Sequence, residues 1–297
     1  VRLTFDRMKS SPYCRHMRFR NCQIREAVIT IIFLMVLAHL WISVTNSLRT
    51  QRNEISISLK DISVNRSFRI AVIGDMHTRE DRGALSKLRD LLDKIKESDP
   101  DLVLFLGDYT SNPRFIDDLT EHRRNVVDVL ASILHYPSFF VLGNYENWSE
   151  PEKWRKEFLT SDLKVLENET QIIETKSGII CIRGLGDSFT NRFTYVDYPV
   201  GCESLPRITI THDPAGAFHS EMEGLVIAGH THCGQVSLPL IGAIWVPSIA
   251  PRNATCGLYQ DENITLYVTS GVGTSILPIR YGAQSHWDFI NLTYSSD

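Results

Sequence analysis

Seven side chains that can bind a metal ion stand at or just after the ends of short apolar segments. The segments are IGDMH, LGDY, LGNY, ITHD and AGHTH, and the side chains are Asp75, His77, Asp108, Asn144, His212, His230 and His232. One such residue predicts little, because Gly-Asp after a strand is usually a turn and a single buried histidine is usually a hydrogen-bonded core residue. All of them together predict a shared site, since α/β proteins bind ligands at the carboxyl ends of strands. Imidazole, carboxylate and amide ligands suit manganese, iron, zinc or a similar metal.

The segments around these residues alternate between strand-like and helix-like patterns. In the first half we expect strands over 68–75, 101–108 and 139–144 and amphipathic helices over 83–98 and 115–134. This order implies right-handed crossovers and a largely parallel sheet. In the second half we expect a hairpin over 171–187 and further strands over 207–214, 225–232 and 263–271. The pattern predicts an α/β sandwich of two sheets with helices outside.

The ordered set D-x-H, G-D, G-N, H and G-H-x-H resembles the calcineurin-like metallophosphoesterase superfamily over roughly residues 68–295. The strings GHTHCGQ (229–235) and TSGVGTSILPIRYGA (269–283) resemble its membrane-associated bacterial branch, which is related to the YkuE and YaeI phosphoesterases. The resemblance implies a four-layer αββα sandwich of two mixed sheets holding two divalent metal ions. It assigns Asp75, His77 and His232 to the first ion. It assigns Asn144, His212 and His230 to the second, with Asp108 as the bridge.

A metal pair of this kind implies hydrolysis of a phosphate ester or anhydride. Two cations clamp a phosphoryl oxygen and lower the pKa of a water molecule, so that hydroxide attacks phosphorus without a protein nucleophile. The resemblance makes Asp108, Asn144, Tyr145 and His230 the catalytic candidates. A serine or cysteine hydrolase is the weaker alternative. The sequence has no G-x-S-x-G motif, and Cys233 belongs to the segment 229–235 that carries His230 and His232, which we call the metal loop.

The sequence departs from the family pattern at GNYE, residues 143–146, where the family usually has G-N-H-E or G-N-H-D. The missing histidine normally stabilises or protonates the leaving oxygen, and a tyrosine with a pKa near 10 is a poor proton donor at neutral pH. One reading is a substrate whose leaving group needs no proton, such as a pyrophosphate. The UDP-2,3-diacylglucosamine pyrophosphatases of lipid A synthesis also lack this histidine, and an enzyme of that type is an alternative. A slower, specialised enzyme and a non-catalytic metal-binding module are the other readings.

The N-terminal part of the chain predicts a membrane anchor. Residues 27–44 contain no formal charge, and as a helix they would be about 27 Å long, enough to cross a bilayer. A cleaved signal peptide and a buried core helix are the alternatives. Residues 1–26 carry a net charge of +5 and the rest of the chain −9, which favours a cytoplasmic N-terminus and a catalytic body outside. The acidic body argues against a nucleic-acid partner.

These features divide the chain into a basic arm (1–26), a transmembrane anchor (27–44), a stalk expected to end in a strand (45–66) and a phosphoesterase domain (67–297). The apolar stretch VSLPLIGAIWVPSIAP, 236–251, is either core or a lip that touches a lipid substrate. Arg280 either meets a phosphate or pairs with an acidic surface residue. The four cysteines of the body could form disulfides in an oxidising compartment, but their spacing does not fix the pairs. The expected partners are therefore a phosphate-containing substrate, plausibly a lipid or cell-envelope precursor, and the bilayer.

Overall fold

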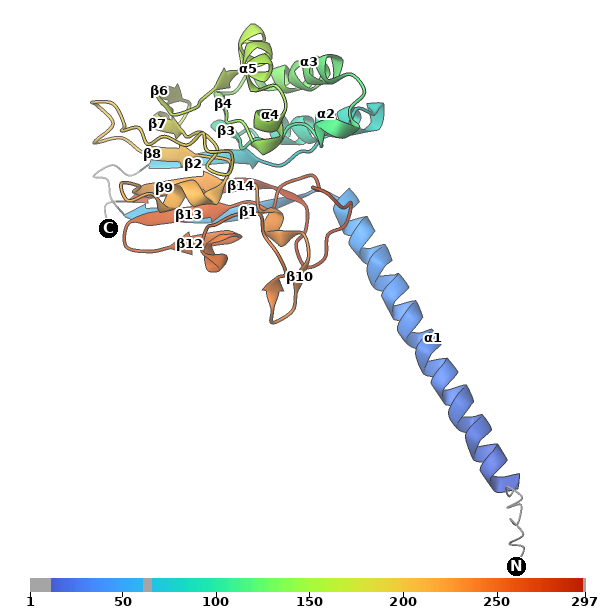
Figure 1. The fold of residues 1–297 in the computed structure, drawn as a ribbon. Helices are drawn as coiled ribbons and strands as arrows, with labels where there is room; N and C mark the ends of the chain where they lie inside the picture. Colours follow the sequence, from blue (N-terminus) through green and yellow to red (C-terminus); the bar gives the residue numbers. More distant parts are fainter. Residues whose placement is uncertain (1–11, 61–65, 296–297) are drawn as a thin grey trace, which may run out of the picture.

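The computed structural model describes residues 12–60 and 66–295. Figure 1 shows a layered body from which one long helix, α1 (Pro12–Leu48), projects. Residues 1–11 of the predicted basic arm and residues 61–65 of the predicted stalk lie outside the described part of the chain.

Two mixed sheets form the centre of the body, as the resemblance implied. The first has the strand order β1-β14-β2-β3-β4-β5. In chain order its strands are β1 (Gln51–Lys60), β2 (Arg66–Ile73), β3 (Leu102–Phe105), β4 (Ser138–Phe140), β5 (Lys164–Val165) and β14 (His286–Ser295). Strands β2 to β5 are parallel, and β14 runs antiparallel to β2 and parallel to β1.

The second sheet has the strand order β12-β13-β9-β8-β7-β6. Its strands are β6 (Glu169–Thr175), β7 (Gly178–Gly184), β8 (Arg207–Ile210), β9 (Gly224–Ala228), β12 (Gly257–Gln260) and β13 (Ile264–Val268). The β6–β7 hairpin confirms the hairpin predicted over 171–187. Strands β7, β8, β9 and β13 are parallel, so their carboxyl ends meet at one edge. A separate small hairpin consists of β10 (Ser237–Leu238) and β11 (Gly242–Ala243).

Helices α2 (Arg82–Glu97), α3 (Leu119–Leu130) and α5 (Pro151–Thr160) cover the outer face of the first sheet (Figure 1). The leucine face predicted for 83–98 is buried there. Helix α3 is shorter than the predicted 115–134, because Asp118 caps its first turn by accepting hydrogen bonds from Thr120 and Glu121. A 3₁₀ turn, Ala131–Ile133, follows the helix. A short helix α4 (Asn144–Trp148) starts directly at the predicted site.

Three buried apolar clusters hold these layers together. One lies between the helices and the first sheet, and the second lies between the two sheets, where Val72 and Leu104 meet Ile210 and Ile227. Because the first sheet is covered on both faces, its central strands carry continuous apolar runs, IAVI at the end of β2 and LVLF in β3, rather than an alternating pattern. The third cluster covers the outer face of the second sheet, where short 3₁₀ helices, Pro214–Phe218 and Arg252–Ala254, form the fourth layer.

The predicted stalk 45–66 requires a correction. Residues 51–60 form β1, which pairs with β14 along its whole length. The cause is an alternating pattern, ISISL, which turns Ile55, Ile57 and Leu59 toward the cluster between the sheets. The folded body therefore begins at Gln51 rather than at residue 67, and almost no free linker separates it from α1.

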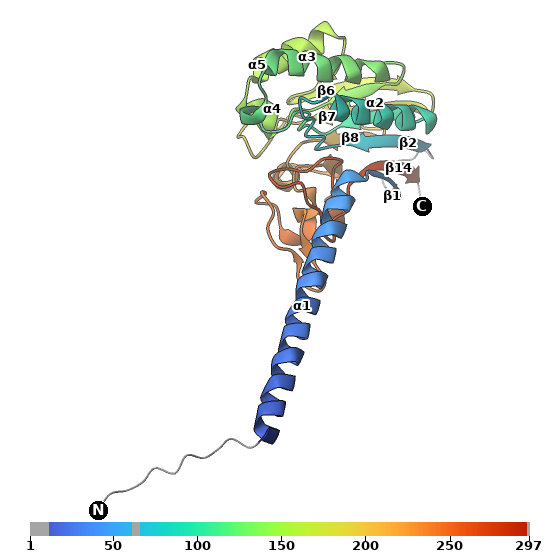
Figure 2. The same cartoon turned by 90° about the vertical axis from the view of Figure 1, so that its right-hand side faces the viewer.

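Helix α1 contains a stretch, Arg25–Ser47, that is long and apolar enough to cross a membrane, and nearly all of it is exposed. Its last turns contact the segment 278–281 of the body, where Ser47 donates a hydrogen bond to the Pro278 carbonyl (2.9 Å) and the Ser43 carbonyl accepts one from the Arg280 amide (3.1 Å). Figure 2 shows the helix leaving the body beside the β10–β11 hairpin.

Candidate metal centre

The seven predicted ligand residues converge at the carboxyl edges of the two sheets. Asp75 and His77 follow β2, Asp108 follows β3 and Asn144 begins α4 after β4; His212 follows β8, and His230 and His232 follow β9. All seven are buried. These side chains come from both halves of the sequence. They meet in one place because the two sheets pack face to face.

Backbone strain is concentrated at these residues. The φ angles of Asp75, His77, Asp108, His230 and His232 lie between 45° and 68°. Side-chain-bearing residues rarely adopt this left-handed conformation, and each instance costs on the order of 1–3 kcal/mol. Such strain is typical of functional sites, where the surrounding fold holds residues in the orientation that a ligand requires.

The first group consists of Asp75, His77 and His232, whose ligand atoms lie within 4.8 Å of one another. The two Nε2 atoms of His77 and His232 are 2.9 Å apart, and the His232 Nε2 lies 3.6 Å from an Asp75 oxygen. Two ligands at right angles on one cation, with bonds of about 2.1 Å, stand about 3 Å apart. The nitrogen pair therefore has the separation that a shared cation would give it.

The second group consists of Asp108, His212 and His230, with Asn144 beside it. The His212 Nε2 lies 3.2 Å from the His230 Nδ1 and 3.1 Å from the Asn144 Oδ1. The Asp108 Oδ2 is 3.5 Å from the His212 Nε2 and also 3.5 Å from the His77 Nε2 of the first group. Asp108 thus stands between the two groups, as a bridging carboxylate would.

Backbone carbonyls fix the orientation of two of these imidazoles. The His212 Nδ1 lies 2.6 Å from the Leu106 carbonyl, and the His230 Nε2 lies 2.7 Å from the Pro247 carbonyl. In the neutral imidazole each of these nitrogens carries the proton and donates it, so the opposite nitrogen then presents a lone pair to the centre. Metal-binding histidines commonly use such an outer hydrogen bond, and this donor set fits a metal.

Burial also sets the charge of the ligands. It lowers the pKa of His77 and of His230 to about 4, so both imidazoles are neutral at pH 7 and are available as ligands. Burial raises the pKa of Asp75 to about 7 in the metal-free centre. A nearby cation favours the ionised carboxylate, so metal binding near neutral pH would release a proton from this residue.

Glu146 is a residue of the site that the sequence analysis did not single out. Its carboxylate accepts four backbone N–H bonds, from Asp108 (2.9 Å), Tyr109 (2.8 Å), Thr110 (3.1 Å) and Gly143 (2.9 Å). Burial and the charge of Asp108 raise the pKa of this carboxyl, and the N–H donors oppose them. The residue joins the loop after β3 to the loop after β4, and so it positions Asp108 and Asn144. The sequence signal that could have identified this residue is the glutamate of GNYE.

Gly143, which precedes Asn144, is required by this close packing. A Cβ atom at this position would lie 2.3 Å from the Asp108 Oδ1. Any larger residue would displace the carboxylate that stands between the two ligand groups.

Tyr145 lies next to Asp108 and His77. Its backbone N–H donates to the Asp108 Oδ1 (3.0 Å), its ring packs edge-on against His77 with centroids 4.9 Å apart, and its hydroxyl is 2.9 Å from the Ser275 Oγ. Burial raises the pKa of the phenol above its usual value. The hydroxyl is therefore a neutral group at pH 7 that can share a hydrogen bond with Ser275.

Arg280 lies in the interior of the protein, which contradicts its predicted pairing with an acidic surface residue. It is fully buried and donates to the carbonyls of Ser270 (2.7 Å) and Gly273 (2.6 Å), while its Nη2 lies 3.0 Å from the His232 Nδ1. It therefore pairs with backbone carbonyls in the interior rather than with an acidic surface residue. It holds the loop after β13 against the back of the His232 ring.

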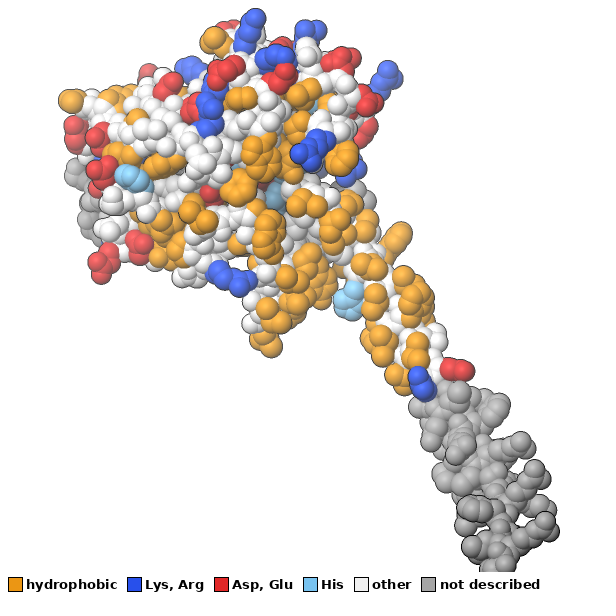
Figure 3. Space-filling view, viewed as in Figure 1, with side chains coloured by type: hydrophobic (Ala, Val, Ile, Leu, Met, Phe, Trp, Pro, Cys, Tyr) orange, Lys and Arg blue, Asp and Glu red, His pale blue; other side chains and the backbone are white. Residues whose placement is uncertain are grey.

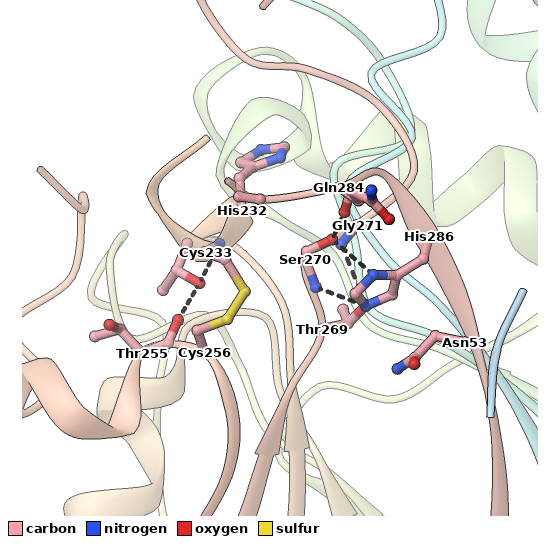
Figure 4. Close-up of a disulfide and its surroundings, with 12 residues drawn as sticks. Asn53, His232, Cys233, Thr255, Cys256, Thr269, Ser270, Gly271, Gln284 and His286 are labelled. Carbon is pink, nitrogen blue, oxygen red and sulfur yellow. Dashed lines mark hydrogen bonds between the residues drawn. A yellow bond between two sulfur atoms is a disulfide. The ribbon is translucent and has the colours of Figure 1, made fainter. Parts of the chain in front are cut away.

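The four body cysteines form two disulfides, Cys181–Cys202 and Cys233–Cys256. Figure 4 shows the second of them directly beside His232. The Thr231 hydroxyl donates to the Thr255 carbonyl across the same two segments (2.7 Å). The metal loop is thus tied to the segment before β12, and Cys233 is not a free thiol that could act as a nucleophile.

A Ser–His–Asp arrangement near this loop does not favour a serine hydrolase either. The Ser270 Oγ lies 3.1 Å from the His286 Nδ1 (Figure 4). The His286 Nε2 lies 3.2 Å from an Asp288 oxygen. However, Ser270 is buried and its hydroxyl donates to the Gln284 carbonyl. It is absent from the lining of the cavity at the centre, so the arrangement is part of the packing between β13 and β14.

A cavity of about 420 Å³ opens onto the two ligand groups. Asp108, Asn144, Tyr145 and His230 form its polar floor. Its walls are mainly apolar and include Trp148, Phe189, Ile244, Trp245, Ile276 and Leu277. The stretch 236–251 therefore contributes to the wall of this cavity as well as to the surface.

Comparison with known proteins agrees with this geometry. The profile of the family described as calcineurin-like phosphoesterase matches residues 68–234. The chain is 29% identical over 223 residues to the metallophosphoesterase YkuE of Bacillus subtilis, covering 73% of this chain and 76% of that protein. It is 27% identical over 213 residues to the phosphodiesterase YaeI of Escherichia coli, covering 70% of this chain and 76% of that protein.

A third relative is a zebrafish (Danio rerio) transmembrane protein with a metallophosphoesterase domain. It is 25% identical over 281 residues, which are 88% of this chain and 61% of that protein. The family profile spans more than half of the chain and includes all seven predicted ligand residues. This chain belongs to the calcineurin-like phosphoesterase family, in the branch that resembles YkuE and YaeI.

Proposed function

We propose that the protein is a membrane-anchored enzyme that uses two divalent metal ions to hydrolyse a phosphodiester or pyrophosphate bond. The observation that carries this proposal is the pair of ligand groups with Asp108 between them. Asp75, His77 and His232 would hold one ion, and Asn144, His212 and His230 the other. When bound, such a metal pair supplies Lewis acidity and a water molecule of lowered pKa.

The remaining roles belong to the residues of this chain. Glu146 holds the loops that carry Asp108 and Asn144, and Tyr145 places a neutral hydroxyl beside the centre. A phenol of raised pKa can donate a hydrogen bond to a leaving oxygen but protonates it poorly. This chemistry favours substrates whose leaving group is weakly basic, such as the phosphate end of a pyrophosphate.

The cavity supports a substrate that carries an apolar portion. Its walls of Trp, Phe, Ile and Leu would gain little from a small sugar phosphate, and they suit an acyl or isoprenoid chain. We therefore propose a lipid or cell-envelope precursor as the substrate class. A UDP-diacylglucosamine-type pyrophosphate is a special case of this class.

The anchor and its orientation are also part of the proposal. The stretch Arg25–Ser47 supports a single membrane span. The basic residues before it support a cytoplasmic N-terminus. The two disulfides support a body on the extracytoplasmic side, because disulfides persist in oxidising compartments.

Hydrolysis of bis-p-nitrophenyl phosphate by the purified full chain with added Mn²⁺ tests the reaction. We expect turnover that a chelator abolishes, with two metal ions per chain by plasma emission. Two bound ions without turnover of this diester or of any phosphate in a lipid extract, followed by mass spectrometry, would instead identify a non-catalytic metal-binding module. Protease digestion of intact cells tests the side of the membrane, since a body outside should be degraded without cell lysis.

A further inference from the structure

We infer that the mouth of the cavity is inserted into the bilayer that α1 crosses, so that the substrate enters the site from the lipid phase. Two loop tips and the segment that follows β11 would make this insertion. We call them the apolar rim, and it consists of Leu240, Ile241, Ile249, Ile276 and Leu277. The inference rests on the proposed anchor and deepens the proposed lipid substrate.

The apolar rim is unusually exposed for a surface that faces water. Leu240 and Ile249 have relative exposures of 108% and 92%, and Ile276 has 82%. The stretch 236–251 contains no charged residue, and neither does 269–279. Figure 3 shows the hydrophobic side chains gathered over the β10–β11 hairpin and next to α1, while charged side chains lie mainly on the upper and left parts of the body. A contiguous apolar patch of this kind marks an interaction surface.

The backbone conformation at two positions of the apolar rim also disfavours apolar residues. Leu240 has a φ of 67° and Ile276 has a φ of 50°. Glycine or asparagine favours this conformation, and a β-branched residue is rarely found in it. In water, asparagine would suit both the backbone and the solvent at these tips. Leucine and isoleucine are favourable there only if an apolar environment receives the side chains.

Contacts with α1 identify that environment as the lipid bilayer. Pro278 and Arg280, which directly follow the second tip, hydrogen-bond to Ser47 and Ser43 on the helix. The ring of Tyr281 lies 6.0 Å from that of His39, between centroids. His39 precedes the end of the helix at Leu48 by nine residues, which is about 13 Å along the axis. The loop 276–281 therefore runs beside the last turns of the proposed span.

The length of the span also places the loop 276–281 at the level of the bilayer. Arg25–Ser47 has 23 residues, or about 34 Å as a helix, against a hydrocarbon thickness of about 30 Å. A bilayer that covers most of this stretch must reach the turns that the loop 276–281 contacts. In Figures 1 and 2 the β10–β11 hairpin projects from the body on the same side as α1. Both loop tips would thus meet the leaflet from which α1 emerges.

This placement has a consequence for the site. Ile276 and Leu277 of the apolar rim also line the cavity. The exposed residue Trp245 lines it as well. Tryptophan is favoured at the membrane interface. A lipid could keep its chains in the leaflet while its phosphate reaches the floor of the cavity, so the lipid need not pass through water.

Tryptophan quenching in the full chain tests the insertion directly. We would reconstitute the protein into phosphatidylcholine–phosphatidylglycerol vesicles whose acyl chains carry bromine, and compare Trp245→Phe with Trp154→Phe, which removes a fully buried indole. The Trp245 variant should lose a quenched emission component, and the Trp154 variant should not. If the emission lost with Trp245 is unquenched while Trp41 in the anchor remains quenched, the anchor stands and the insertion is refuted.

A second measurement compares substrates and is independent of the fluorescence. Leu240→Asn/Ile249→Asn replaces two rim residues, and Val200→Asn is the control, because Val200 is as exposed as Ile249 (92% each). Val200 precedes Cys202, whose disulfide partner Cys181 pairs with the first residue of β8, whereas the metal centre lies beyond the carboxyl end of that strand. We expect the double variant to lower the ratio of hydrolysis of a long-chain nitrophenyl phosphodiester in vesicles to that of the soluble diester by about tenfold. The control should leave the ratio unchanged.

An unchanged ratio in the double variant would overturn the inference. If the wild type hydrolyses neither substrate, the proposed function fails, and the quenching measurement still decides whether the apolar rim is inserted.

Discussion

Glu146→Gln should damage the metal centre although glutamine has nearly the same shape as glutamate. Each carboxylate oxygen of Glu146 accepts two backbone N–H bonds, Oε1 from Tyr109 and Thr110 and Oε2 from Asp108 and Gly143. Glutamine replaces one oxygen by an NH₂ group, which can only donate. Whichever way the amide turns, one of these two pairs of N–H groups loses its acceptor.

The magnitude follows from the number of N–H groups left without a partner. A buried donor without an acceptor costs about 1–3 kcal/mol, so two of them cost about 2–6 kcal/mol. For a domain of this size this corresponds to a melting temperature lower by roughly 5–20 °C. Because the same bonds position Asp108 and Asn144, we also expect weaker metal binding.

Thermal unfolding followed by circular dichroism, metal counting and hydrolysis of bis-p-nitrophenyl phosphate measure the effect. Glu169→Gln is the matched control, since Glu169 is exposed at the start of β6. The control should match the wild type in all measurements. A Glu146→Gln protein with wild-type melting temperature and two bound metals would refute the reasoning that this carboxylate holds the loops together.

Three further predictions concern the ligands and Tyr145. Asp108→Ala should abolish hydrolysis and lower the bound metal, because two cations would face each other without a shared anion; activity and plasma emission measure this. Tyr145→His should raise rates mainly for substrates with basic leaving groups at unchanged metal content, whereas Tyr145→Phe should cost about 0.5–1.5 kcal/mol for one lost hydrogen bond. The measurement is kcat/KM across esters of graded leaving-group pKa. Asp75, whose pKa is about 7 in the metal-free centre, is half protonated at that pH, so metal affinity should fall about tenfold per pH unit below it.

Each of these predictions has an outcome that contradicts it. Unchanged activity with two metals in Asp108→Ala would remove Asp108 from the bridging position. Equal slopes against leaving-group pKa for the wild type and Tyr145→His would make the tyrosine a spectator. Chelator competition at pH 6 and pH 7 that gives equal metal affinities would show that Asp75 carries no proton for the metal to displace.

The sequence alone predicted the seven candidate ligand residues and most of the elements that carry them. Apolar runs ending in Gly-Asp, Gly-Asn, Thr-His or Gly-His predicted strands with polar residues at their carboxyl ends, and β2, β3, β4, β8 and β9 lie where these runs stand. Local periodicity is enough for such a prediction, because the alternation of strand and helix fixes which ends of parallel strands share an edge. The apolar stretch of α1 could likewise be recognised from composition alone.

Tertiary structure decided the features that depend on contacts between distant parts of the chain. The pairing of Cys233 with Cys256 and the burial of Arg280 behind His232 leave no periodic signal in the sequence. The same is true of the pairing of β1 with β14, which turned a predicted stalk into an edge strand. Glu146 was visible as a letter of GNYE, but its role depends on where four N–H groups from two loops happen to point. Sequence patterns report which side chains face a core, whereas backbone hydrogen bonds to a single carboxylate exist only once the sheets have packed.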